Sequence, residues 1–120
     1  MDDCVELIAD CRLRATTDLF LHRWDPVLLA ALADGPRRRA ELLTAIGGIS
    51  DKVLTESLRR LLANGLVART RRGGAPPRVD YALTALGTSL VDGPLQAMGR
   101  WTLEHGDELL AAQELGSRTA

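Results

Sequence analysis

The chain lacks the features of a membrane protein, of a disulfide-stabilised scaffold and of a disordered chain. No apolar stretch in its 120 residues approaches the roughly 18 that a membrane-spanning helix needs. The opening residues, MDDCVELIAD, are acidic and do not resemble a signal peptide, so we expect a cytoplasmic protein. Two cysteines in a reducing compartment do not indicate a disulfide scaffold. Because 46% of the residues are hydrophobic and 26% are charged, the composition is that of a folded domain.

The sequence also lacks the motifs of the common enzyme classes. It contains no nucleophile elbow, P-loop, dinucleotide-binding fingerprint or paired-carboxylate motif. The glycine-rich RGGAPP at residues 72–77 is not a phosphate loop, because no helix start follows it closely. His22 and His105 form no compact metal-ligand set with the cysteines. We therefore expect no enzymatic activity, no bound metal and no cofactor.

Charge is distributed unevenly along the chain, although the formal net charge is only −1. Residues 34–80 hold ten basic and five acidic side chains, which is a local balance of +5. The remaining residues hold five arginines and eleven acids, a balance of −6. A basic middle between acidic ends favours a polyanion-binding centre, and ordinary solvated charge is the alternative.

Start and stop signals predict four helices in the first half of the chain. Residues 3–21 carry apolar side chains near a helical period, and Asp25-Pro26 is typical of the start of a second helix, with Asp25 as its cap. A short third helix is expected at residues 39–46, where RAELLTAI is followed by two glycines. Ser50 is a good N-cap for a fourth helix that runs to about residue 63.

The second half predicts a hairpin and a final helix. Two short strands, at about 66–71 and 78–83, flank RGGAPP. Thr84 then caps a last helix that is kinked near residues 92–94 and continues to about residue 115. The fold class expected is mainly α with a small β-hairpin (α+β). Two short helices joined by a glycine turn and followed by a hairpin describe a winged helix-turn-helix.

The fourth predicted helix carries one apolar face and one face suited to nucleic acid. At about 100° per residue, its leucines fall on one side: Leu54, Leu58 and Leu61. Hydrogen-bonding side chains fall opposite or beside them: Lys52, Thr55, Glu56, Arg59 and Arg60. Arginine and lysine can read guanine, threonine can meet a thymine methyl or a phosphate, and glutamate can accept from cytosine. An ordinary amphipathic surface helix shows the same pattern, so this helix alone does not decide the function.

The hairpin strengthens the nucleic-acid interpretation. Arginines on a hairpin next to such a helix can reach phosphates, and the glycines allow the tip to approach a backbone closely. The prolines limit the entropy lost when the hairpin docks.

Taken together, these residues resemble the HxlR family of bacterial winged helix-turn-helix transcriptional regulators. The shared features are Arg23-Trp24, the Gly35-Pro36 break, the GIS-K-LT pattern that starts at Gly48, and PPRVDYALTALG at residues 76–87. The resemblance covers nearly the whole chain. It implies a regulator that binds double-stranded DNA at a palindromic operator as a homodimer.

The resemblance also implies a division of labour along a single domain, residues 1–120. Residues 1–22 would form an N-terminal dimerisation helix, 23–83 the DNA-binding core and 84–116 a C-terminal dimerisation helix. The residues expected at DNA are Arg38, Arg39, Ser50, Lys52, Thr55, Glu56, Arg59, Arg60, Arg72, Gly73 and Arg78. Arg39 departs from the family, which usually has an aromatic residue there.

The inducing signal has two candidates. Cys11 lies where some family members carry a thiol switch, which makes it a candidate redox sensor, and a small buried apolar side chain is the alternative reading. A small-molecule effector could instead bind a pocket at the dimer helices, for which the candidate residues are Leu7, Cys11, Trp24, Met98 and Trp101. A winged-helix protein-interaction module that does not bind DNA remains the alternative function.

Overall fold

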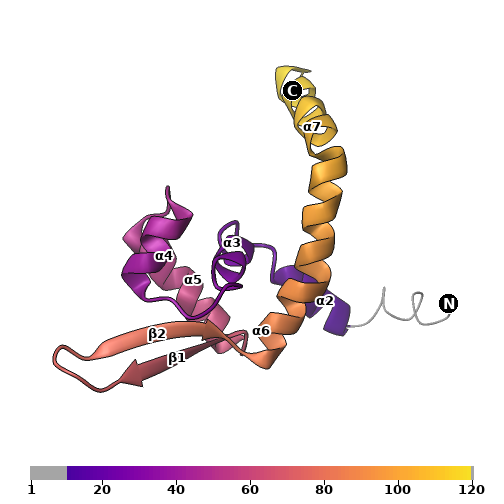
Figure 1. Cartoon of the computed structure of the whole chain (residues 1–120). Coiled ribbons are helices and arrows are strands. Elements are labelled where there is room, and N and C mark those ends of the chain that lie inside the picture. The colour runs from indigo at the N-terminus through magenta and orange to yellow at the C-terminus, as the bar shows by residue number, and fades with distance from the viewer. Residues whose placement is uncertain (1–10, 120) are drawn as a thin grey trace.

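The computed structural model describes residues 11–119 as a helical body, a long hairpin and a projecting C-terminal helix (Figure 1). The elements in chain order are α2 (Cys11–Asp18), α3 (Asp25–Ala31), α4 (Arg39–Ile46), α5 (Asp51–Ala63), β1 (Val67–Arg72), β2 (Arg78–Leu83), α6 (Ala85–Leu90), the π-helical turn η1 (Val91–Leu95) and α7 (Gln96–Thr119). The mainly helical class with one antiparallel hairpin is therefore confirmed.

Local signals place α4 and α5 as predicted. The Ser50 hydroxyl accepts a hydrogen bond from the Val53 amide at 3.1 Å, which caps α5. Gly47 and Gly48 between the two helices have φ of 66° and 69°, a backbone conformation that other residues rarely adopt. Thr84 caps α6 in the same way as Ser50, since its hydroxyl accepts from the Gly87 amide at 3.0 Å.

A leucine core joins the three helices of the body. Its buried side chains come from α3, α4 and α5, from the residue after α3, and from the residues at and just before the start of β1: Leu28, Leu29, Leu32, Leu42, Leu54, Leu58, Leu61, Leu66 and Val67. The leucine face predicted for α5 is the face that packs inward, so the opposite face of this helix is left at the surface.

The hairpin is tied to the helices at its base and extends away from them (Figure 1). β1 and β2 pair in antiparallel register from Val67↔Leu83 to Arg72↔Arg78. Arg37, just before α4, exchanges two backbone hydrogen bonds of 2.9 Å with Tyr81 of β2. This short bridge fixes the orientation of the hairpin relative to the start of α4.

Three local predictions were wrong in detail. The first helix ends at Asp18 and not near residue 21, and its predicted beginning lies outside the described residues. Asp25 does not cap α3, because its carboxylate turns inward to side chains of α5. The last helix continues to Thr119 after a π-helical turn around Pro94, where the sequence indicated a kink.

The C-terminal helix α7 projects from the body and leaves large apolar side chains at the surface (Figure 1). These exposed side chains include Met98, Trp101, Leu103, Leu109 and Leu110. Among residues 11–119, no helix combines the length and hydropathy needed to cross a membrane. In the single chain, α7 therefore presents an apolar face to solvent.

Candidate nucleic-acid interface

The outer face of α5 presents the polar side chains that the sequence predicted for it. Lys52, Thr55, Glu56 and Arg59 are exposed, whereas Leu54 and Leu58 on the opposite face are buried. The Thr55 hydroxyl donates to the Asp51 carbonyl at 3.0 Å, so this side chain lies back along the helix. Lys52 and Arg59 are the exposed cations of α5, and both can reach outward from the helix.

A shallow groove of about 250 Å³ joins this helix to the base of the hairpin. Its walls include three arginines from three elements, namely Arg39 of α4, Arg59 of α5 and Arg69 of β1. Arg69 was not among the predicted contact residues, because strand alternation in a hairpin does not show which face turns toward α5. The one sequence signal for Arg69 as a contact residue was its position in the basic stretch of residues 69–72.

Arg39 connects the two helices of the helix-turn-helix. Its Nη2 donates to both the carbonyl and the carboxylate of Asp51, at 2.8 Å each. Asp51 is the first residue of α5, so the ion pair joins the start of α4 to the start of α5. Because the pair is largely exposed, its net contribution to stability is small, below about 1 kcal/mol.

Arg60 has a role inside the protein that the sequence did not show. It makes two hydrogen bonds of 2.9 Å to Asp25, whose side chain is only 5% exposed. The buried Ser57 hydroxyl donates to the same carboxylate at 2.5 Å. Hydrogen bonding to Asp25 raises the pKa of Arg60 above its ordinary value, since the charged guanidinium is the donor. The guanidinium of Arg60 is thus directed at α3.

The wing, defined here as residues 67–83, holds two of its four arginines against one buried carboxylate. Asp80 accepts from the Nε of Arg72 at 2.9 Å and from the Nε of Arg78 at 3.1 Å. The Asp80 side chain is 5% exposed, while those of Arg72 and Arg78 are 61% and 48% exposed. Both guanidinium groups therefore share one negative charge and still reach solvent. Gly73, next to Arg72 at the tip, is exposed as well.

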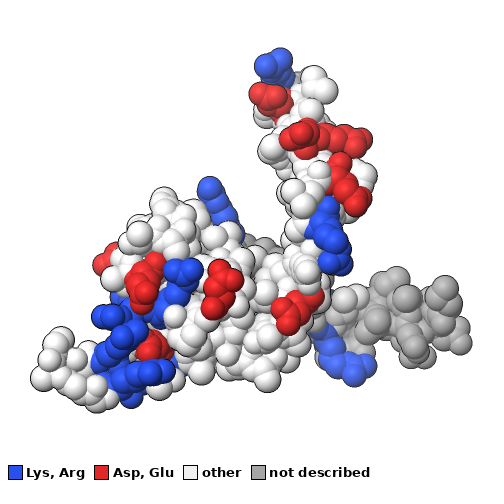
Figure 2. Space-filling model, viewed as in Figure 1, with Lys and Arg blue, Asp and Glu red and all other residues white. Residues whose placement is uncertain are grey.

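The charge segregation predicted from the sequence is visible on the surface. Figure 2 shows Lys and Arg side chains gathered over the hairpin and the adjoining helices, while Asp and Glu side chains line much of α7. Arg38 belongs to the basic side and lies 3.7 Å from Glu41 in the first turn of α4. The molecule thus presents a basic surface at one end and an acidic helix at the other.

Of the five residues expected at a pocket between the dimer helices, the four that the structure describes do not line a common pocket in the single chain. Leu7 lies outside the described residues, and Cys11 is exposed at the start of α2. Trp24 is packed against the core with Arg23 over its ring at 5.1 Å, whereas Met98 and Trp101 are about half exposed on α7. Within residues 11–119, no three His, Cys, Asp or Glu side chains are grouped to hold a metal ion.

Comparisons with known proteins agree with this architecture. The model of the HxlR-like helix-turn-helix family matches residues 19–109. The chain is 37% identical over 91 residues to YkvN of Bacillus subtilis, an uncharacterised HTH-type transcriptional regulator, with 76% of each chain covered. It is similar to the reduced form of the transcriptional regulator YodB of B. subtilis, with 34% identity, a TM-score of 0.70, and 76% of this chain and 88% of that one covered. It is also similar to the redox regulator HypR in its reduced form, with 32% identity, a TM-score of 0.75, and 83% and 98% covered.

Proposed function

The chain belongs to the HxlR-like helix-turn-helix family, and from that premise we propose that it is a cytoplasmic transcriptional regulator that binds a palindromic operator as a homodimer. The observation that carries the proposal is the exposed polar face of α5 beside the arginine-bearing wing. In this proposal α5 enters the major groove, where Lys52 and Arg59 contact base edges. The wing arginines Arg72 and Arg78 contact phosphates, because a hairpin at the side of the helix lies outside that groove.

The remaining predicted residues divide according to their surroundings in the fold. Ser50 and Arg39 position α5 at its N-terminal end, and Thr55 and Glu56 share its outer face with the two cations. Arg69 joins the proposed contact set because it lies in the same groove as Arg39 and Arg59. We assign Arg60 a structural role and not a DNA contact, because its guanidinium is hydrogen-bonded to Asp25.

The surface of α7 supports the proposed homodimer. Trp101, His105, Leu109 and Ala112 recur at helical spacing and line one groove along this helix. Trp101 is 50% exposed and Leu109 is 43% exposed, so a second copy packed on this stripe would remove a large apolar area from water. A twofold arrangement of this kind should place the two α5 helices about one DNA turn apart, roughly 34 Å.

The test is a titration of fluorescent duplexes with the purified protein. The DNA upstream of its own gene is compared with a scrambled duplex of the same composition. Arg59→Ala and Lys52→Ala should lose operator affinity selectively, by about 1–3 kcal/mol for each lost base contact. Arg118→Ala, near the end of α7, is the matched control and should bind as the wild type does. Equal, weak binding to both duplexes by the wild type would favour the alternative of a protein-interaction module.

The proposed signal is either a thiol oxidant or a small molecule. The similarity to HypR and YodB supports a redox input, and Cys11 is exposed and free in the described structure. A thiol at the surface is accessible to oxidants, which a buried packing cysteine is not.

A further inference from the structure

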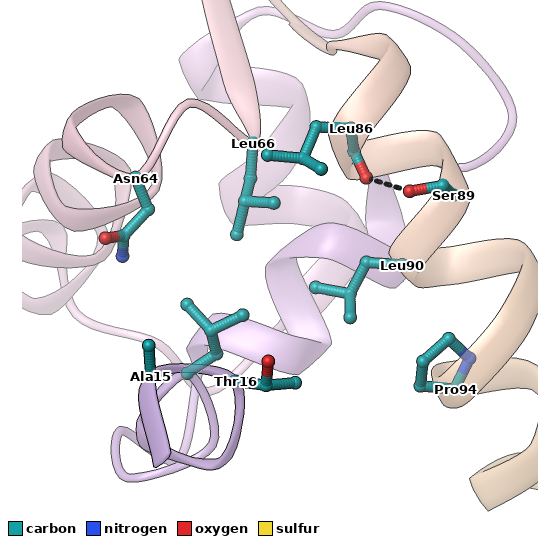
Figure 3. A pocket seen from close by; sticks show the side chains of 9 residues that line it. Ala15, Thr16, Asn64, Leu66, Leu86, Ser89, Leu90 and Pro94 are labelled. Carbon is teal, nitrogen blue, oxygen red and sulfur yellow. Dashed lines mark hydrogen bonds between the residues drawn. The ribbon is translucent and has the colours of Figure 1, made fainter. Parts of the chain in front are cut away.

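A pocket of about 370 Å³ opens between α2, the end of α5 and α6 (Figure 3). Ala15 of α2 forms one wall and Leu86 and Leu90 of α6 form the other. Asn64 and Leu66, the residues on either side of the turn after α5, close a third side. Of the five residues that the sequence indicated for an effector site, the four within residues 11–119 do not line this pocket.

The lining of this pocket is largely apolar and, among the described residues, carries no charged side chain. Two hydroxyls line it, and both donate to backbone carbonyls: Thr16 to Arg12 at 2.9 Å and Ser89 to Leu86 at 2.6 Å (Figure 3). They can still accept a hydrogen bond. The Asn64 carboxamide also lines the pocket, and such a group can both donate and accept a hydrogen bond.

These properties select a class of ligand. An ionised group placed among Leu66, Leu86 and Leu90 would lose hydration without gaining a counter-charge, which disfavours charged molecules. An uncharged molecule of two or three rings with a single polar group would bury its apolar surface and pair with Asn64.

The pocket also touches the two segments whose positions matter for the proposed DNA binding. Leu66 directly precedes β1, and its carbonyl accepts from the Thr84 amide at 3.0 Å, so it is fixed between the wing and α6. Pro94 lies in η1, the π-helical turn from which α7 leaves the body. π-helical turns occur frequently at functional sites. A ligand here therefore contacts both the base of the wing and the origin of α7.

We propose that this pocket is an effector site for a neutral, largely apolar small molecule. The inference rests on the proposed function, because an effector is meaningful only for a regulator. Ligand occupancy would change the angle between the α5–wing unit and α7, and hence the spacing of the two α5 helices in a dimer.

Two dyes with the same ring system separate charge from shape. N-phenyl-1-naphthylamine is neutral, and 1-anilinonaphthalene-8-sulfonate adds one sulfonate. The full chain should bind the neutral dye saturably, with one site per chain and at least tenfold more tightly than the sulfonate. Ala15→Phe fills the pocket from α2 and should weaken binding of the neutral dye at least tenfold. Ala111→Phe, an exposed position on α7, is the matched control and should leave dye binding unchanged.

Several outcomes would overturn the proposal. One is the absence of saturable binding of the neutral dye by the full chain. Another is equal binding by Ala15→Phe and the wild type, or a preference for the sulfonate. Dye binding is measured without DNA, and operator binding is measured without dye, so a failure of either proposal is recognised separately. Saturating neutral dye should then change the operator affinity of the wild type by about fivefold or more, and not that of Ala15→Phe.

Discussion

Replacing Asp80 by asparagine isolates the electrostatic contribution of the wing. In the wild type, Arg72 and Arg78 share the Asp80 carboxylate at 2.9 and 3.1 Å, so these three side chains carry a net charge of +1. Asp80→Asn keeps the size and one acceptor oxygen of the side chain and raises that local charge to +2. The wing of the variant should then contact one more DNA phosphate than the wild type does, on DNA of any sequence.

The magnitude follows from counterion release. Each additional phosphate contact steepens the plot of log K against log salt by about 0.9. Between 50 and 200 mM salt, Asp80→Asn should therefore lose about 3.5-fold more affinity than the wild type loses over the same range. At low salt the variant should bind scrambled DNA more tightly than the wild type.

The assay is fluorescence anisotropy on a scrambled duplex at four or more salt concentrations. Asp107→Asn makes the same change in net charge on α7, away from the wing, and should leave the slope unchanged. Denaturant unfolding of all three proteins shows whether each is folded at the assay temperature. An Asp80→Asn slope that equals or falls below that of the wild type would refute the reasoning, because the carboxylate would then not be limiting the charge of the wing.

Three further predictions concern stability and signalling. Arg60→Ala leaves the Asp25 carboxylate buried without its cation and should cost about 3 kcal/mol in denaturant unfolding, whereas the exposed neighbour Arg59→Ala should stay within about 0.5 kcal/mol. Gly87→Ala places a methyl group against the Leu66 carbonyl and should destabilise the fold by about 1–3 kcal/mol. The control Gly99→Ala places its methyl group where no atom lies within 4 Å on α7, so it should be neutral or stabilising. Equal unfolding midpoints for the two variants would contradict the close approach of Gly87 to Leu66. Cys11→Ser should bind DNA as the wild type does and lose any response to diamide, and a response that persists in this variant would exclude Cys11 as the sensor.

The sequence by itself determined the elements whose signals are local. Ser50 and Thr84 cap their helices through amides three residues away, and Gly47 and Gly48 supply the turn conformation within their own backbone. The leucine period of residues 54–61 was sufficient to identify the buried face of α5, because one face of a helix repeats at a fixed spacing. The sequence alone also indicated the family, because the motif PPRVDYALTALG at residues 76–87 is contiguous and needs no tertiary structure to be recognised.

Only the tertiary structure decided how residues far apart in the chain meet. Asp25 is a residue type that often caps helices and stands at the start of α3. Its carboxylate instead pairs with Ser57 and Arg60, which lie 32 and 35 residues further on. No periodicity encodes that choice, because the burial of a carboxylate becomes favourable only when a cation and a hydroxyl arrive from another helix. For the same reason, the groove formed by Arg39, Arg59 and Arg69 depended on how α4, α5 and the hairpin pack together. The uncharged pocket beside Leu66 depended on how α2, α5 and α6 pack together.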